Sequence, residues 1–129
     1  MPMLLCVGAI NTFLIQKKLR GYVSINVQSG EALDTHSFAT LIGVGATTVN
    51  PYLALDSLYQ RFEKKLFGKF EYDECIERYI QSVNYGLLKI MSKMGISVLS
   101  SYRGGCNFET VGLSRTVVND YFPGVTSKI

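Results

Sequence analysis

The fold is decided by the stretch Tyr22-Val23-Ser24-Ile25-Asn26-Val27-Gln28, which is followed by a turn, a helical segment and a second apolar run. Its branched apolar residues alternate with polar ones, and this period of two is typical of a strand with one buried face. Asp34 is a suitable N-cap for a helix over residues 35–42, and residues 47–49 are a short strand candidate. The order strand, helix, strand predicts a βα unit built around parallel strands.

Helical periodicity extends on both sides of this unit. Further helices are predicted over residues 3–19, 51–66, 73–94, 101–111 and 114–121. Asn50 is expected to cap the second of these, with Pro51 at its first helical position. Gly86 costs about 1 kcal/mol inside the longest helix, so a break near residues 84–86 is an open alternative. The predicted fold class is α/β: a helix-rich, partial βα unit of barrel-like character, incomplete on its own because too few strands are present to close a barrel.

Composition and charge fit one globular unit. The chain has 129 residues, of which 47% are hydrophobic and 18% charged, and its net charge is +3. The basic residues cluster where helices are predicted to end, and cations there complement the helix dipole. Without a longer basic stripe or interleaved aromatic residues, we expect no nucleic-acid partner. The apolar segment 3–15 is shorter than the ~20 residues that span a bilayer, so we expect no membrane partner and a cytoplasmic location.

The thiol and imidazole groups are scattered along the sequence. Cys6, Cys75 and Cys106 have no paired spacing, and His36 is the one histidine. A structural zinc site needs four clustered Cys or His ligands, so no metal ligand is predicted. We expect the three cysteines to be buried free thiols of a reducing compartment.

Two further patterns favour structural roles. Gly43-Val44-Gly45 resembles the start of a dinucleotide fingerprint, but it follows a helix and lacks the third glycine, so a tight helix-to-strand turn is the better interpretation. Asp73 and Glu77 lie in the first turns of the long helix, where acids are favoured by the dipole, and Glu74 can pair with Arg78. No catalytic residue is predicted.

The most donor-rich neighbourhood lies late in the sequence. Lys89 and Lys93 share one helix face, and they are expected to gather with Ser92, Ser100, Ser101, Tyr102 and Arg103. Lysine and arginine donors could hold a phosphate or a carboxylate, whereas the alternative is a domain-docking surface. His36 is expected to make a hydrogen bond at a helix end or to a partner. The roles of these cations stay open at the level of sequence.

Several short segments, in one order over nearly the whole chain, resemble the glutamate synthase family. The most specific is Met91-Ser92-Lys93-Met94-Gly95-Ile96-Ser97. The others are His36-Ser37-Phe38-Ala39, Leu41-Ile42-Gly43-Val44-Gly45-Ala46, Val49-Asn50-Pro51-Tyr52-Leu53-Ala54, Tyr79-Ile80, residues 84–89, Ser101-Tyr102-Arg103-Gly104, Phe108-Glu109, Val111-Gly112-Leu113-Ser114 and Tyr121-Phe122.

The resemblance implies that the chain is an internal piece of a large enzyme. That enzyme hydrolyses L-glutamine, transfers the ammonia to 2-oxoglutarate and reduces the product to L-glutamate with FMN and a 3Fe–4S cluster. The family's glutaminase cysteine, FMN phosphate loop and cluster cysteines have no counterpart in this sequence. The chain alone is therefore expected to bind neither cofactor and to be inactive. The resemblance does not distinguish NADPH, NADH and ferredoxin as the electron donor.

The resemblance also predicts a division of the chain and its partners. Residues 1–70 would be the C-terminal part of the central domain, and residues 71–129 a helical segment that leads into the FMN-binding domain. The remaining domains or subunits of the enzyme would be its partners, and this piece would scaffold them. Two alternatives are a stand-alone α/β module that binds a small anionic ligand and a purely structural interaction domain.

Overall fold

The two strands expected from the sequence pair in parallel, as predicted. β1 (Asn26–Gln28) lies beside β2 (Thr48–Asn50), and α2 (Thr35–Gly43) is the crossover helix between them. The structure is a computed structural model that describes residues 1–105 and 107–128. Asp34 caps α2 as expected, because its carboxylate accepts the Ser37 N–H at 2.8 Å. The turn after α2 is tight, with Gly45 at φ +128°, so the glycines of this turn are structural.

A second βαβ unit lies at the end of the chain. β3 (Glu109–Val111) and β4 (Thr126–Lys128) also pair in parallel, and α6 (Arg115–Tyr121) connects them. In the part of the chain that the structure describes, each sheet has two strands and neither closes into a barrel. The helix-rich, incomplete α/β class is therefore confirmed.

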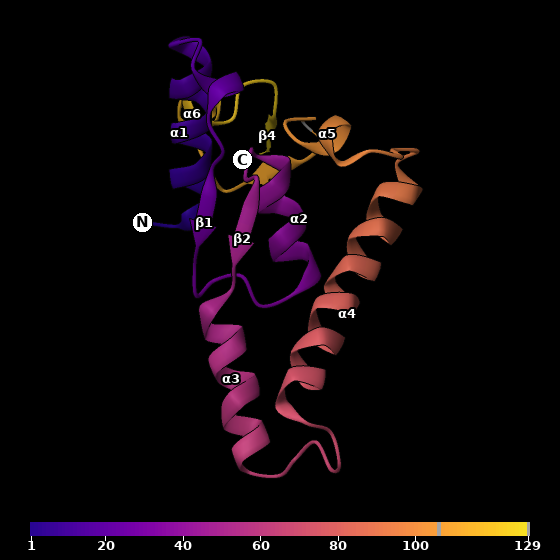
Figure 1. Cartoon of the computed structure of the whole chain (residues 1–129). Helices are drawn as coiled ribbons and strands as arrows, with labels where there is room; N and C mark the ends of the chain where they lie inside the picture. Colours follow the sequence, from indigo (N-terminus) through magenta and orange to yellow (C-terminus); the bar gives the residue numbers. More distant parts are fainter. Residues whose placement is uncertain (106, 129) are drawn as a thin grey trace.

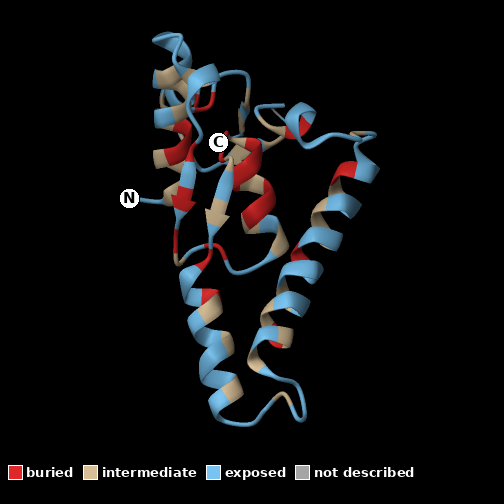
Figure 2. Cartoon of the chain, viewed as in Figure 1, coloured by how far each residue is buried: buried red, intermediate tan, exposed pale blue. Residues whose placement is uncertain are grey.

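The other helices surround these two units. They are α1 (Met3–Gln16), the 3₁₀ turn η1 (Arg20–Tyr22), α3 (Tyr52–Glu63), α4 (Tyr72–Lys93) and α5 (Leu99–Tyr102). Figure 1 shows α1 and α6 side by side, α2 close to β2, and α3 and α4 extending together away from the sheet. The buried residues concentrate in α2, β1 and the inner side of α1, whereas α3 and α4 are mostly exposed (Figure 2).

α2 lies at the centre of the hydrophobic core. On one side, Phe38 and Leu41 pack with Val7 of α1 and Val27 of β1. On the other side, Ala39 and Ile42 belong to a second buried cluster with Met91 of α4 and Tyr102 of α5. Since helix α2 is buried by elements on both sides, it fixes the position of α4 relative to the sheet.

α3 and α4 form an antiparallel hairpin that is closed at its tip. Tyr72 at the start of α4 packs edge-on against Tyr59 with the ring centroids 5.4 Å apart, and its ring centroid lies 5.7 Å from that of Phe62. The guanidinium of Arg78 lies 4.2 Å from the centroid of the Phe70 ring. Aromatic contacts of this kind stabilise the tip independently of the core.

Three expectations about local structure were wrong. The strand expected over residues 22–28 is shorter, because Arg20–Tyr22 forms a 3₁₀ turn and the strand begins at Asn26. The helix that starts at Tyr52 is preceded by Pro51 as its cap residue, so Asn50 belongs to β2 and caps nothing. The helix expected over residues 101–111 ends at Tyr102, and residues 109–111 are a strand.

The possible break in the long helix is absent. α4 runs without interruption from Tyr72 to Lys93, as the main expectation required. The presence of glycine at position 86 is explained by packing, because a Cβ at this position would lie 2.6 Å from the Oγ1 of Thr35. The glycine therefore permits the close approach of α4 to the start of α2.

Candidate functional site

The candidate site is a groove between the start of α2 and the second half of α4. Its lining includes His36 from the first turn of α2, together with Lys89 and Lys93 from successive turns of α4. The groove has a volume of about 510 Å³, and Gly86 and Thr35 form part of its floor. Residues that are about 50 positions apart in the sequence thus contribute their cationic groups to one surface.

The acidic residue of this groove, Asp34, accepts hydrogen bonds from the first turn of α2. The Oδ1 atom of Asp34 accepts hydrogen bonds from the Ser37 N–H at 2.8 Å and from the Ser37 hydroxyl at 2.6 Å. The hydrogen bond from the Ser37 side chain is the largest cause that lowers the pKa of Asp34, and His36 adds a smaller electrostatic contribution. Asp34 therefore stays ionised, and its charge offsets part of the positive charge in the groove.

The two lysines have no acidic partner within the described residues. The ion pairs there are Arg78–Glu74 at 2.9 Å, as expected from the sequence, and Lys128–Glu109 at 2.6 Å. Both Lys89 and Lys93 are exposed. Their ammonium groups are free to reach an anion in the groove, because lysine side chains are long and rotatable.

Arg103 does not join this group, contrary to expectation. It follows α5 and donates from Nε to the carbonyl of Ala46 at 3.1 Å, beyond the C-terminal end of α2. The neighbouring Tyr102 is buried and donates from its hydroxyl to the carbonyl of Ala39 at 3.1 Å. Burial raises the pKa of Tyr102. These two side chains therefore attach α5 and the residue after it to α2 and to the turn that follows α2. His36, which was not expected in this group, shares the groove with Lys89 and Lys93.

Arg20 makes a second arginine contact with the turn after α2. It donates to the side chain of Asn11 at 2.7 Å, to the carbonyl of Val23 at 2.7 Å and to the carbonyl of Gly45 at 2.8 Å. The sequence indicated only a charge near a helix end. The structure assigns this arginine to a junction of α1, the segment before β1 and the turn before β2.

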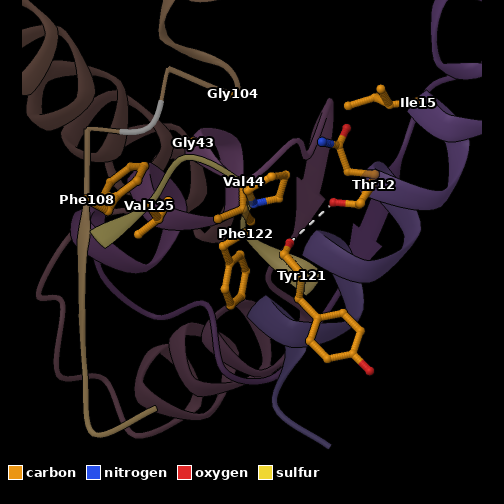
Figure 3. Close-up of a pocket in the computed structure, with 11 residues that line it drawn as sticks. Thr12, Ile15, Gly43, Val44, Gly104, Phe108, Tyr121, Phe122 and Val125 are labelled. Atoms are coloured by element: carbon orange, nitrogen blue, oxygen red, sulfur yellow. Dashed lines mark hydrogen bonds between the residues drawn. The ribbon is translucent and has the colours of Figure 1, made fainter. Parts of the chain in front are cut away.

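A small cavity lies near this junction, between α1, the end of α2 and α6. Its volume is about 120 Å³, and apolar side chains such as Val44, Phe108 and Phe122 form much of its wall (Figure 3). The hydroxyl of Thr12 faces it but already donates to the carbonyl of Tyr121 at 3.4 Å (Figure 3). The cavity therefore offers few free polar groups with which to orient a ligand.

A larger apolar cleft separates the upper parts of α3 and α4. Its volume is about 510 Å³, and it is lined by side chains including Phe38, Val49, Leu55, Ile80 and Leu87. The lining is mostly apolar, with polar groups from residues such as Tyr79 and Asn84. An apolar lining of this kind suits packing against another apolar surface.

The described cysteines do not form a cluster. Cys75 is a buried free thiol in α4, as predicted, whereas Cys6 in α1 is only partly buried, because its helix turn lies at the edge of the core. Cys106 lies outside the described residues. Among residues 1–105 and 107–128, no three His, Cys, Asp or Glu side chains gather as a metal site. An iron–sulfur cluster needs several cysteine thiolates, so these residues do not fit one.

No described helix combines the length and the apolar character needed to cross a membrane.

The fold and its surfaces define a class: a helix-rich α/β unit with two small parallel sheets, open apolar faces and one basic groove. Comparison with known sequences then identifies the family. The glutamate synthase central domain matches residues 1–114, and the chain belongs to this family.

Relatives match over nearly the whole chain. It is 53% identical over 128 residues to the glutamate synthase [NADPH] large chain of Azospirillum brasilense, and 47% identical over 130 residues to that of Bacillus subtilis (strain 168). It is 44% identical over 137 residues to the chloroplastic ferredoxin-dependent glutamate synthase of Spinacia oleracea. Each match covers 99% of this chain but 8% of the relative, so the chain spans less than a tenth of these proteins.

Proposed function

We propose that this chain is a structural segment of glutamate synthase that scaffolds the domains around it. The whole enzyme would form L-glutamate from L-glutamine and 2-oxoglutarate by ammonia transfer and FMN-dependent reduction. FMN and the 3Fe–4S cluster would be held by other parts of the enzyme, in a cytoplasmic setting. The division at residues 70 and 71 stays a prediction, and so does the choice between NADPH, NADH and ferredoxin.

The observation that supports this proposal is the exposure of large apolar side chains on α1 and α4. In α1, Ile10, Phe13 and Ile15 are 50%, 55% and 54% exposed. In α4, Tyr85 and Leu88 are 75% and 60% exposed. Apolar surface of this kind is typical of a unit that packs against neighbours. The remaining domains of the large chain are the partners that family membership suggests.

The alternative function, a stand-alone module that binds a small anionic ligand, explains fewer features of the structure. Such a module is expected to enclose its ligand within a complete sheet or a phosphate loop. Each described sheet has two strands, so neither is complete enough to enclose a ligand. We therefore favour the scaffold.

The test uses the purified 129-residue chain and the same chain with its flanking domains restored. The chain alone is expected to leave FMN fluorescence unchanged and to form no glutamate from glutamine, 2-oxoglutarate and a reductant. The longer protein is expected to quench FMN fluorescence and to form glutamate. Saturable quenching of FMN at micromolar concentration, or turnover by the short chain, would contradict the scaffold proposal.

A further inference from the structure

The basic groove between α2 and α4 carries an inference that goes beyond scaffolding. Its cationic groups come from two elements: His36 from α2, and Lys89 and Lys93 from α4. We propose that this groove binds a small, doubly charged oxyanion, such as phosphate or a dicarboxylate.

The spacing of the lysines supports a bidentate contact. Residues one helical turn apart have Cβ atoms about 5–6 Å from each other, so both ammonium groups can reach oxygen atoms of the same ligand. Lysine provides three donors and no acceptor, which suits an oxyanion. His36 approaches from the opposite wall, so the ligand would contact both helices.

The charge of the groove supports an anion over a neutral ligand. Lys89 and Lys93 contribute two positive charges to the groove. Asp34 contributes one negative charge, and its carboxylate already accepts two hydrogen bonds from Ser37. Residues 80–95 of α4 and its C-terminal turn contain no Asp or Glu. The two lysines therefore have no intramolecular counter-charge within reach along their own helix.

The floor of the groove is part of the packed structure. Gly86 keeps its backbone against Thr35, and a Cβ there would meet the Oγ1 of Thr35 at 2.6 Å. Within the same part of α4, Met91 is buried in a cluster with Ala39 and Ile42 of α2. The lysines thus project from a helix whose position relative to His36 is fixed by core contacts, which reduces the entropy lost when a ligand binds.

The experiment is a titration of ¹⁵N-labelled chain with inorganic phosphate, followed by amide chemical shifts at constant low ionic strength. Low salt is needed because the Debye length falls from about 30 Å at 0.01 M to about 10 Å at 0.1 M. Saturable shifts confined to residues 34–37 and 86–94 are the expected result. Linear shifts that spread equally over the other basic clusters would overturn the proposal. A parallel titration with succinate distinguishes the two chemistries, since binding of either one supports the oxyanion site and binding of neither refutes it.

Variants test which side chains hold the anion. The double variant Lys89→Gln/Lys93→Gln is expected to weaken binding about tenfold, because two exposed ion pairs together contribute up to about 2 kcal/mol and a factor of ten corresponds to about 1.4 kcal/mol. Lys89→Arg/Lys93→Arg keeps both charges and is expected to bind within about threefold of the original chain. The matched control Lys64→Gln/Lys65→Gln removes two charges from the hairpin tip. Equal weakening by the control would show nonspecific attraction and overturn the site. Because all four lysines are exposed, circular dichroism is expected to show the same fold in every variant.

Discussion

Removing the hydroxyl of Tyr102 tests how α5 is attached to the core. This side chain is 1% exposed, its hydroxyl donates to the carbonyl of Ala39 at 3.1 Å, and its ring packs edge-on against Phe108 with the ring centroids 6.1 Å apart. Tyr102→Phe deletes one buried hydrogen bond and keeps the ring, which costs about 1 kcal/mol of unfolding free energy. Tyr102→Ala also empties the space of a buried ring, which costs about 3–5 kcal/mol.

Urea unfolding followed by circular dichroism measures both changes. With a slope of about 2 kcal/mol per molar urea, Tyr102→Phe is expected to lower the midpoint by about 0.5 M and Tyr102→Ala by about 1.5–2.5 M. The matched control is Tyr85→Phe, since Tyr85 is 75% exposed. If Tyr102→Phe shifts the midpoint no more than Tyr85→Phe, the hydrogen bond to Ala39 does not stabilise the fold. A loss below about 1 kcal/mol for Tyr102→Ala would refute the buried position itself.

Alkaline pH provides a second measurement on the same residue. Burial raises the pKa of Tyr102, and burial followed by the charge of Asp34 raises the pKa of Tyr79. The folded state therefore favours the neutral phenols. Their contribution is complete below the ordinary tyrosine pKa of 10.0 and is lost as the pH rises through the higher pKa of the folded state. Tyr102→Phe is expected to reduce this alkaline loss of stability, and an unchanged pH profile would contradict it.

Three further predictions concern the helix cap, the helix contact and the open surface. Asp34→Ala is expected to lower the free energy of unfolding above pH 3.8, where the Asp34 carboxylate is ionised and caps α2. As the pH falls through the lowered pKa of Asp34, the stabilities of the variant and the original chain should converge. A stability difference that stays constant down to pH 2 would contradict the cap. Gly86→Ala is expected to cost about 1–3 kcal/mol in thermal unfolding by overpacking against Thr35, whereas Gly21→Ala, which has open space around it, should have little effect; equal effects would refute the close contact. The folded chain is expected to bind the dye 8-anilinonaphthalene-1-sulfonate strongly through its exposed apolar helices, and a silent, monodisperse monomer would count against the scaffold proposal.

The sequence predicted the parts of the fold whose pattern is local. The long helix over residues 73–94 carries 22 residues with one apolar face, and it occurs as α4 from Tyr72 to Lys93. The parallel pair β1 and β2 followed from two short apolar runs on either side of a capped helix. These elements depend on hydrophobic periodicity and helix caps, and both are properties of residues that are close in the sequence.

The expected helix over residues 101–111 failed because local chemistry opposed it. Gly104 and Gly105 are poor helix formers, and Gly104 has a φ of +73° that an ordinary side chain rarely adopts. The strand at 109–111 is three residues long and depends on pairing with residues 126–128, so no period could reveal it. Non-local pairing of short strands is a tertiary property.

The composition of the basic groove could be predicted only in part. Lys89 and Lys93 were grouped correctly, because positions four apart share a helix face. His36 could not be added, since the packing of α2 against α4 is set by buried residues such as Phe38, Ala39 and Val83. Arg103 was grouped wrongly because α5 ends at Tyr102 and turns the next side chain toward Ala46.

The aromatic contacts at the tip of the α3–α4 hairpin make the connecting loop structurally independent of the rest of the chain. Tyr59, Phe62 and Tyr72 hold α3 and α4 together at their near ends, so residues 64–71 need only close a short distance. Lengthening such a loop twofold costs only about 0.6 kcal/mol in closure entropy. Leu66 at this tip is 66% exposed, and Lys65 and Gly68 adopt positive φ angles typical of a turn. The tip is therefore a position where an inserted peptide or an affinity tag leaves the core and the basic groove intact.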